Sequence, residues 1–146
     1  MTTIGSIDYR FGNELDLDTV IDVYRRSTLG ERRPVDDRER MGLMLRGANL
    51  VVSAWDGPRL VGLARSLSDF CYATYLSDLA VDVEYQRRGI GRELMRLTQQ
   101  AGGKATTFLF AAPKAVDYYP HVGFTRGSGW MLRSDEPLPE RIDAAT

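Results

Sequence analysis

Residues 78–92 read Asp-Leu-Ala-Val-Asp-Val-Glu-Tyr-Gln-Arg-Arg-Gly-Ile-Gly-Arg, and this stretch decides how the rest of the chain is arranged. An apolar, strand-like segment runs into a polar loop, and an amphipathic helix is expected to begin at Ile90. A helix start leaves backbone N–H groups unpaired and carries partial positive charge. Gly89 and Gly91 would let a bulky anion approach the backbone. Three arginines adjoin the turn: Arg87, Arg88 and Arg92. The stretch therefore predicts a diphosphate site.

The loop lacks the two commonest nucleotide-binding motifs. The dinucleotide fingerprint Gly-x-Gly-x-x-Gly fails at Leu94, and no Gly-Lys-Ser/Thr sequence is present. The spacing of Gln86, Gly89 and Gly91 instead fits the pattern Gln/Arg-x-x-Gly-x-Gly/Ala. In this respect the loop resembles the pyrophosphate loop of the GCN5-related N-acetyltransferases, the GNAT family.

A second segment resembles the same family. Residues 115–124 read Ala-Val-Asp-Tyr-Tyr-Pro-His-Val-Gly-Phe, and the family has a late Ala-x-x-Phe-Tyr-x-x-x-Gly-Phe signature. Tyr118 replaces the Phe of that signature, and four positions match it: Ala115, Tyr119, Gly123 and Phe124. The two motifs stand in the family's order, and the resemblance extends over roughly residues 5–133.

The resemblance implies an α+β GNAT fold, a mixed and mostly antiparallel twisted sheet with helices on both faces. We expect a single N-acetyltransferase domain over residues 1–146, with a loose tail at 134–146. The implied cofactor is acetyl-CoA. The residues expected to contact it are Leu79, Ala80, Val81, Val83, Gln86, Arg87, Arg88, Gly89, Ile90, Gly91, Arg92 and Tyr119.

Hydrophobic periodicity predicts the elements that would carry these motifs. Helices are expected over residues 16–27, 36–48, 90–101 and 114–119, the last limited by Pro120. Strands are expected over residues 4–11, 50–55, 60–67, 71–81, 106–111, 124–126 and 130–133. The apolar run at 106–111 is typical of a buried central strand. The last two strands would close the sheet as a hairpin.

Acetyl transfer to an amine requires one proton to leave and another to be supplied. An alkylammonium with a pKa of about 10.4 costs roughly 4.6 kcal/mol to deprotonate at pH 7. The resemblance implies that Tyr119 donates a proton to the leaving thiolate, which a phenol can do at neutral pH. The alternative is that Tyr119 packs in the core, as Tyr118 is expected to do.

Asp78 is the candidate base because it stands inside an otherwise apolar strand, where burial would raise the pKa of its carboxyl. The alternative interpretation is a structural carboxylate that pairs with an arginine or caps backbone N–H groups. Asp69, Ser77 and His121 are further candidates for the base.

The acceptor is expected to approach from the side opposite the cofactor, and its walls are expected to be Leu29, Arg33, Pro34, Phe70, Tyr72 and Tyr75. Three aromatics suit an apolar or aromatic amine, although they would equally suit sheet packing or a homodimer contact. Residues 108–124 resemble the branch of the family that contains serotonin N-acetyltransferases, which also indicates a small amine. Ala112 departs from the Asn that many members have there.

These observations predict direct transfer of an acetyl group from acetyl-CoA to the primary amine of a small molecule in a ternary complex. The alternatives are a protein or peptide N-acetyltransferase and a non-catalytic acyl-CoA sensor. A sensor would not need the Tyr119 hydroxyl, whereas an enzyme would.

The composition bounds the remaining possibilities. The 146 residues carry 19 basic and 20 acidic side chains, so no general positive field favours nucleic acid or an anionic membrane. Cys71 is the only cysteine, which predicts a reducing compartment, the cytoplasm. No signal peptide or apolar run of about 20 residues is visible. One His and one Cys cannot form a metal cluster, so no metal is expected.

Overall fold

The computed structural model describes residues 6–140. The chain divides into two compact units, with the boundary in the sequence between Phe110 and Ala111. The first unit holds strands β1 (Asp8–Phe11), β2 (Leu50–Asp56), β3 (Arg59–Ser68), β4 (Ala73–Val81) and β5 (Thr106–Phe108). It also holds helices α1 (Leu17–Arg26), α2 (Arg38–Gly47) and α3 (Ile90–Ala101). The second unit holds α4 (Tyr118–His121).

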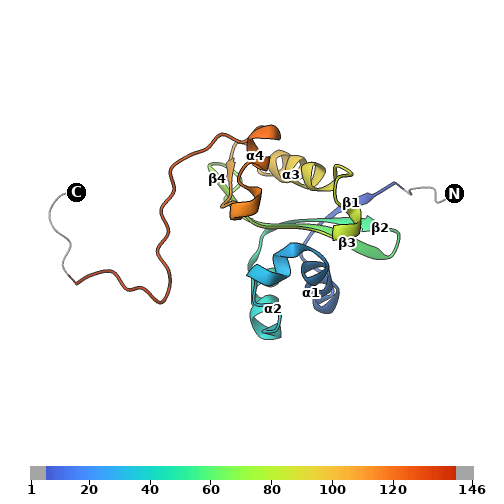
Figure 1. Ribbon diagram of the computed structural model, residues 1–146, viewed down its shortest axis with the longest axis horizontal. Coiled ribbons are helices and arrows are strands. Elements are labelled where there is room, and N and C mark those ends of the chain that lie inside the picture. The colour runs from blue at the N-terminus through green and yellow to red at the C-terminus, as the bar shows by residue number, and fades with distance from the viewer. Residues whose placement is uncertain (1–5, 141–146) are drawn as a thin grey trace. The chain divides into compact units, whose positions relative to one another are not determined.

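The five strands form one sheet in the order β1-β2-β3-β4-β5. The first four are antiparallel neighbours, and β5 runs parallel to β4. In Figure 1, α1 and α2 lie against one face of this sheet and α3 lies against the other. The sheet of the first unit is therefore mixed, mostly antiparallel and covered on both faces, as expected.

The α1–α2 face holds the main core because both helices are amphipathic. Val20, Val23 and Tyr24 of α1 are almost fully buried and pack with Met41 of α2 and Leu63 of β3. Burying a large apolar side chain of this kind stabilises the fold by roughly 1.5–3 kcal/mol.

Both core helices begin at an aspartate that accepts a hydrogen bond from a backbone N–H of the first turn. Asp16 accepts from Thr19 at 3.0 Å, and Asp37 accepts from Arg40 at 3.1 Å. Each carboxylate satisfies a donor that has no partner inside the helix and complements the positive end of the helix dipole. The caps explain why both helices start within two residues of the predicted positions.

Most element boundaries agree with the sequence prediction. The helix predicted over residues 90–101 is confirmed at both ends, and the β2–β3 hairpin turns through Gly57 at a positive φ of 57°. The first strand begins at Asp8, while the predicted start at Ile4 lies outside the described residues. Among the described residues, no helix has the length and apolarity that crossing a membrane requires.

The prediction of a buried central strand over residues 106–111 was wrong. β5 stops at Phe108, stands at the edge of the sheet and leaves its side chains partly or fully exposed. The apolar character has another cause, because Phe108 and Phe110 pack their rings against Tyr75.

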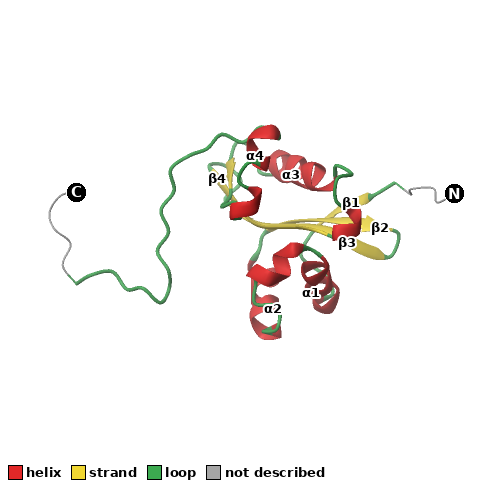
Figure 2. Ribbon diagram, viewed as in Figure 1, coloured by secondary structure: helices red, strands yellow, loops and turns green. Residues whose placement is uncertain are grey.

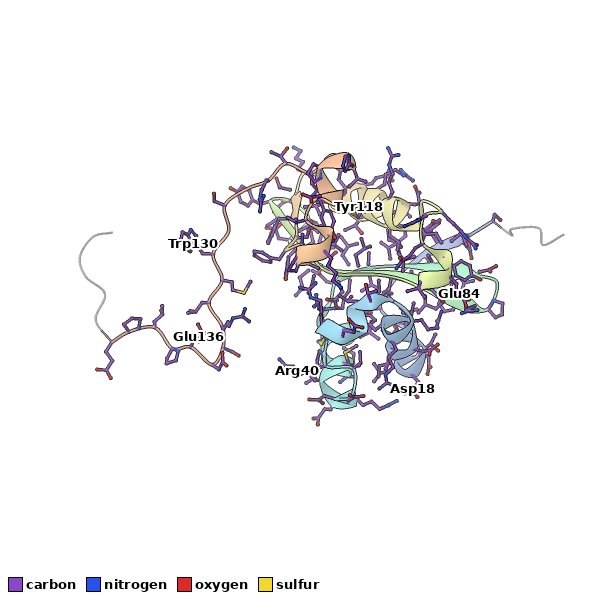
Figure 3. All side chains as sticks on the ribbon, in the orientation of Figure 1. Asp18, Arg40, Glu84, Tyr118, Trp130 and Glu136 are labelled. Atoms are coloured by element: carbon purple, nitrogen blue, oxygen red, sulfur yellow. The ribbon has the colours of Figure 1, made fainter. Side chains whose placement is uncertain are left out.

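The predicted closing hairpin, residues 124–126 and 130–133, was also wrong. After α4 the chain runs as coil and turns up to residue 140, where the described part ends, and no strand forms in this stretch, as Figure 2 shows. Trp130, labelled in Figure 3, is 96% exposed. Pro120 was expected to limit the short helix, yet it lies inside α4. A proline is tolerated there because first-turn N–H groups have no intrahelical partner.

Candidate functional site

The loop between β4 and α3 ends in a left-handed turn that opens the helix. Gly89 is the N-cap of α3 with φ 81°, and no side chain caps the helix start. Arg87 also has a positive φ of 65°, which is uncommon for a residue with a side chain. The first N–H groups of α3 therefore remain available to an anion, and the helix dipole favours negative charge there.

Two hydrogen bonds hold this loop against the sheet, and a cation–π contact lies within the loop. Gln86 donates its side-chain amide to the carbonyl of Val81 at 3.1 Å. The Tyr85 hydroxyl donates to the Asp56 carboxylate at 2.5 Å, and the Arg88 guanidinium lies 4.9 Å from the centre of the Tyr85 ring. The loop is thus fixed without a ligand, which lowers the entropy cost of binding one.

Asp82 anchors the start of the same loop from inside the protein. It is 1% exposed and accepts hydrogen bonds from Arg26, from Arg59 at 3.0 Å and from the Glu84 backbone at 2.9 Å. Burial alone would raise the pKa of the Asp82 carboxyl, but the Glu84 N–H and the charge of Arg26 hold that pKa below its ordinary value. The carboxylate therefore stays charged and ties α1, the β2–β3 hairpin and the loop together. Glu84 is labelled in Figure 3.

β4 separates from β5 before it reaches the loop. Only three residue pairs join the two strands, ending at Tyr75 and Phe108, whereas β4 continues to Val81. Within residues 6–140, no strand pairs with that edge of β4 beyond Tyr75. A linear ligand with amide groups could therefore pair with the exposed backbone of this strand.

The turn has the backbone N–H groups and arginines that a bound pyrophosphate requires, and the individual contacts to the cofactor stay a prediction. A Cβ at Gly91 would make ordinary van der Waals contacts with Val81 at 3.7 Å and Leu79 at 4.0 Å, so this glycine lies close to the side chains of β4. The side chains of Ala80 and Ile90 are 1% and 2% exposed, so these two residues could offer only backbone groups. Val83 and the three arginines of the turn are exposed.

Asp78 lies at the centre of a buried cluster on the α1–α2 face of the sheet. Its Oδ2 accepts from the Tyr24 hydroxyl and from Arg65 Nε, both at 2.6 Å. Its Oδ1 accepts from Arg33 Nε at 2.6 Å. Arg65 also donates to the Ser77 hydroxyl at 2.9 Å, and Arg33 to the Ser77 carbonyl at 2.8 Å. We call these five residues the Asp78 cluster.

The expectation that burial raises the pKa of Asp78 was wrong. Burial by itself acts in that direction, but hydrogen bonding and charge from Arg65, the Tyr24 hydroxyl and the charge of Arg33 outweigh it. The net result holds the pKa of the Asp78 carboxyl below its ordinary value. The structural alternative, pairing with arginine, is the one that the geometry shows.

A β-bulge at Ser77 brings this cluster onto the same face of the sheet as Tyr75. Arg65 pairs with Asp78, but the next residue of β3 pairs with Leu76, so Ser77 is the extra residue. Leu67 pairs with Tyr75, and alternate residues of β3 share a face. Without the bulge, Tyr75 and Asp78, three residues apart, would point to opposite faces.

Tyr75 forms an aromatic cluster with the end of the first unit. Its ring stacks on Phe108 with centroids 5.2 Å apart and meets Phe110 edge-on at 5.9 Å. Leu67, Phe108 and Phe110 are 43%, 44% and 49% exposed. We call these four residues the aromatic platform. Its phenylalanines were missed by the sequence analysis, which attributed their apolarity to a central strand.

The other predicted acceptor residues lie apart from this platform. Leu29 packs against the main core, and Pro34 is half-buried in the loop between α1 and α2. Phe70 and Tyr72 belong to the β3–β4 turn, where Phe70 has φ 61° and Tyr72 is 81% exposed. Of the predicted set, Arg33 and Tyr75 therefore lie on the same face of the sheet, Arg33 through its contacts with Ser77 and Asp78.

Asp69 organises that turn and is not suited to act as a base. Its Oδ1 accepts from the backbone N–H groups of Tyr72, Cys71 and Ala73, at 2.7, 2.9 and 3.0 Å. Hydrogen bonds from the Tyr72 and Cys71 N–H groups hold the pKa of the Asp69 carboxyl far below its usual range.

Tyr119 lies in the second unit, in α4. Its ring meets those of Tyr118 and Phe124 edge-on, each with centroids 5.4 Å apart, and its carbonyl accepts from the Phe124 N–H at 3.0 Å. Tyr118 was expected to face the core, but it is 44% exposed, whereas Tyr119 is half-buried. His121 is exposed.

Comparison with known proteins identifies the family of the chain. Residues 33–129, more than half of the chain, match the acetyltransferase (GNAT) domain family. GCN5-related N-acetyltransferase 2, chloroplastic, of Arabidopsis thaliana and a histone acetyltransferase of Glycine max are each 37% identical over 71 residues, 45% of this chain. The matched regions are 27% and 30% of those proteins, so the chain matches less than a third of their length.

Solved structures share the fold. A GNAT family acetyltransferase of Streptococcus pneumoniae superimposes with a TM-score of 0.70 at 26% identity, over 88% of this chain and 99% of that one. An aminoglycoside N-acetyltransferase in complex with CoA superimposes with a TM-score of 0.69 at 15% identity, over 88% and 93%. With the fold, the loop and the family match in agreement, the chain belongs to the GNAT acetyltransferase family.

Proposed function

We propose that this protein transfers the acetyl group of acetyl-CoA to the primary amine of a small molecule by direct attack in a ternary complex. The observation that carries the proposal is the Gln86–Gly91 turn, which opens α3 at a left-handed glycine without a capping side chain. In a GNAT domain this feature suits the diphosphate of CoA. Arg87, Arg88 and Arg92 are exposed around it and would add charge-assisted contacts.

Acetyl-CoA, when bound, supplies the acetyl group as a thioester. The chain's own contribution would be to orient the arm of that molecule along the open edge of β4 and to supply a proton. The neutral amine nitrogen would form a bond to the acetyl carbon as the carbon–sulfur bond breaks. The surplus amine proton would leave to solvent, and solvent would return a proton to Tyr119 afterwards. Tyr119 Oη would hold the proton that the departing sulfur takes up.

We propose that Asp78 is a positioning residue and that it does not remove the amine proton itself. Both of its oxygens already accept hydrogen bonds from charged or hydroxyl donors, and its low pKa makes it a weak base. Through Arg33 and Arg65 it would orient the groups that line the acceptor side.

Tyr119→Phe tests the acid role directly. The substitution keeps the ring contacts with Phe124 and removes only the hydroxyl. We expect kcat to fall about 100-fold, the lower end for general-acid catalysis, with a small change in KM and in CoA affinity. Stopped assays of CoA release, with calorimetry of CoA binding as the control, measure both quantities. A kcat within threefold of the wild type, where chemistry limits turnover, would remove Tyr119 from the mechanism.

A protein or peptide acceptor is the second candidate, because one relative carries the name histone acetyltransferase. Parallel assays with a small-amine panel and with lysine-rich peptides distinguish the two classes. Acetylation of the peptides alone would replace the small-molecule assignment.

A further inference from the structure

The Asp78 cluster contains one more positive charge than it neutralises. Arg33 and Arg65 are both cationic, and both form ion pairs with the single carboxylate of Asp78. Tyr24 remains neutral, because burial, with the adjacent Asp78 carboxylate, raises the pKa of its hydroxyl. A surplus charge in a partly desolvated place is costly unless solvent or a ligand compensates it.

Arg33 is where that surplus meets solvent. Its side chain is 22% exposed, compared with 10% for Arg65 and none for Asp78. Three of its N–H groups donate to Asp78, to the Arg32 carbonyl and to the Ser77 carbonyl. A guanidinium has five such groups, so among the described residues two remain for an external acceptor.

The aromatic platform and the Asp78 cluster lie on the same face of the sheet, at successive positions along β3 and β4. The bulge at Ser77 places Tyr75 and Asp78 on that face, and Leu67 and Arg65 are alternate residues of β3. One short ligand could therefore contact both. An aromatic ring fits the exposed rings of Phe108 and Phe110, and an anionic group fits Arg33.

We propose that the acceptor is a primary alkylamine that carries both an aromatic ring and a carboxylate, as an aromatic α-amino acid does. The inference rests on the proposed function, and it adds that Arg33 binds the acceptor carboxylate while the aromatic platform binds the ring. The surplus positive charge would repel polyamines, aminoglycosides and lysine-rich tails, so these would be poor acceptors.

The experiment compares phenylalanine with phenylalaninamide, whose neutral amide replaces the carboxylate. The amino group of the amide is the weaker base and is less protonated at neutral pH, so intrinsic reactivity favours the amide. A preference for phenylalanine must therefore come from binding. We expect kcat/KM for phenylalanine to exceed that for the amide by about tenfold to hundredfold, the range for a hydrogen bond to a charged group.

Arg33→Gln should remove that preference, while the neighbouring Arg32→Gln should keep it. Both variants lose one positive charge, but the Arg32 side chain is exposed and outside the cluster. Circular dichroism and CoA affinity check that Arg33→Gln is folded, and Arg33→Lys should recover part of the preference. Calorimetry of phenylalanine binding without acetyl-CoA gives a readout that does not depend on turnover.

The outcomes separate this inference from the proposed function. Acetylation of neutral aromatic amines at equal or higher efficiency would overturn the carboxylate site and leave an N-acetyltransferase of small amines. A preference for phenylalanine that survives in Arg33→Gln would assign the carboxylate to another residue and overturn the role of Arg33. Turnover of polyamines or aminoglycosides alone would likewise overturn only the carboxylate site. Turnover of lysine-rich peptides alone, or of no amine at all, would overturn both proposals.

Discussion

Asp78 shows how a sheet can hold a charged residue without exposing it. Its carboxylate is fully buried, yet three donors from α1, the α1–α2 loop and β3 surround it. The donors come from positions 24, 33 and 65, far apart in the sequence. Asp78 could be identified from the sequence because a carboxylate inside an apolar strand requires hydrogen-bond or charge partners. The same reasoning applied to Arg65 in its own apolar strand would have found the partner.

Asp78→Asn should destabilise the protein by about 3–5 kcal/mol, since it leaves two arginine side chains without their carboxylate. Asp36→Asn is the matched control, because the Asp36 side chain is 96% exposed and pairs with Arg25 at the surface. An exposed pair contributes at most about 1 kcal/mol. Urea unfolding monitored by circular dichroism measures both changes. If Asp78→Asn lowers the free energy of unfolding no more than the control does, the cluster does not stabilise the fold.

The same pair of proteins should differ in acid. A carboxyl whose pKa is lowered by folding stabilises the native state above its unfolded pKa of about 3.9, and this contribution is lost as the pH falls through the folded pKa. The wild type should therefore lose stability below about pH 4 more steeply than Asp78→Asn does. Parallel slopes in the two proteins would contradict the lowered pKa.

At the scale of elements, the local sequence determines where α3 begins and ends. The irregularity of β4 and the position of β5 in the sheet depend on contacts with distant residues. The bounds of α3 could be predicted because Gly89 precedes it, Gly102 follows it and its apolar stripe has helical period. The bulge in β4 has no such signal, since Ser77 is neither glycine nor proline. β5 was misplaced because an apolar run does not reveal whether it packs inside a sheet or stacks rings on its surface.

Gly91→Val tests the cofactor loop without damaging the fold. A Cβ there meets only ordinary contacts with Val81 and Leu79, so the helix should form normally. The added methyl groups would occupy the space proposed for the diphosphate, and CoA affinity should fall at least tenfold by calorimetry. Gly47→Ala in α2, where a Cβ meets nothing within 4 Å, is the control. Gly89 is the poorer choice, since its φ of 81° would strain any side chain. Unchanged affinity in Gly91→Val would relocate the diphosphate.

At the scale of the whole molecule, the family resemblance predicted the α+β fold correctly. The residue patterns near the end of the chain, in contrast, predicted two strands that the structure does not contain. Residues 124–126 and 130–133 contain large apolar side chains on either side of Gly127-Ser128-Gly129, which suggests a hairpin, but apolarity and a turn signal do not supply a partner strand. The single domain over residues 1–146 stays a prediction. The two units are joined after Phe110, whose ring belongs to the aromatic platform.

The exposure of the second unit's coil can be tested through its tryptophan. Trp130 is 96% exposed, whereas Trp55 is half-buried and donates its indole N–H to Ser53 at 2.8 Å. The emission lost in Trp130→Phe should therefore be red-shifted and strongly quenched by acrylamide. The emission that remains should be less accessible to the quencher. If the lost emission is instead blue-shifted and protected, Trp130 is packed in solution.

The bulge at Ser77 also has a consequence for how this gene can change in length. Deleting one codon there would leave a regular β4 that still pairs along β3, so the sheet could survive the loss. The two segments of the strand would, however, present opposite faces, and Tyr75 would part from Asp78. A single inserted residue is therefore what places the aromatic platform and the Asp78 cluster on one face, and a lineage that lost it would keep the fold but lose the acceptor site proposed here.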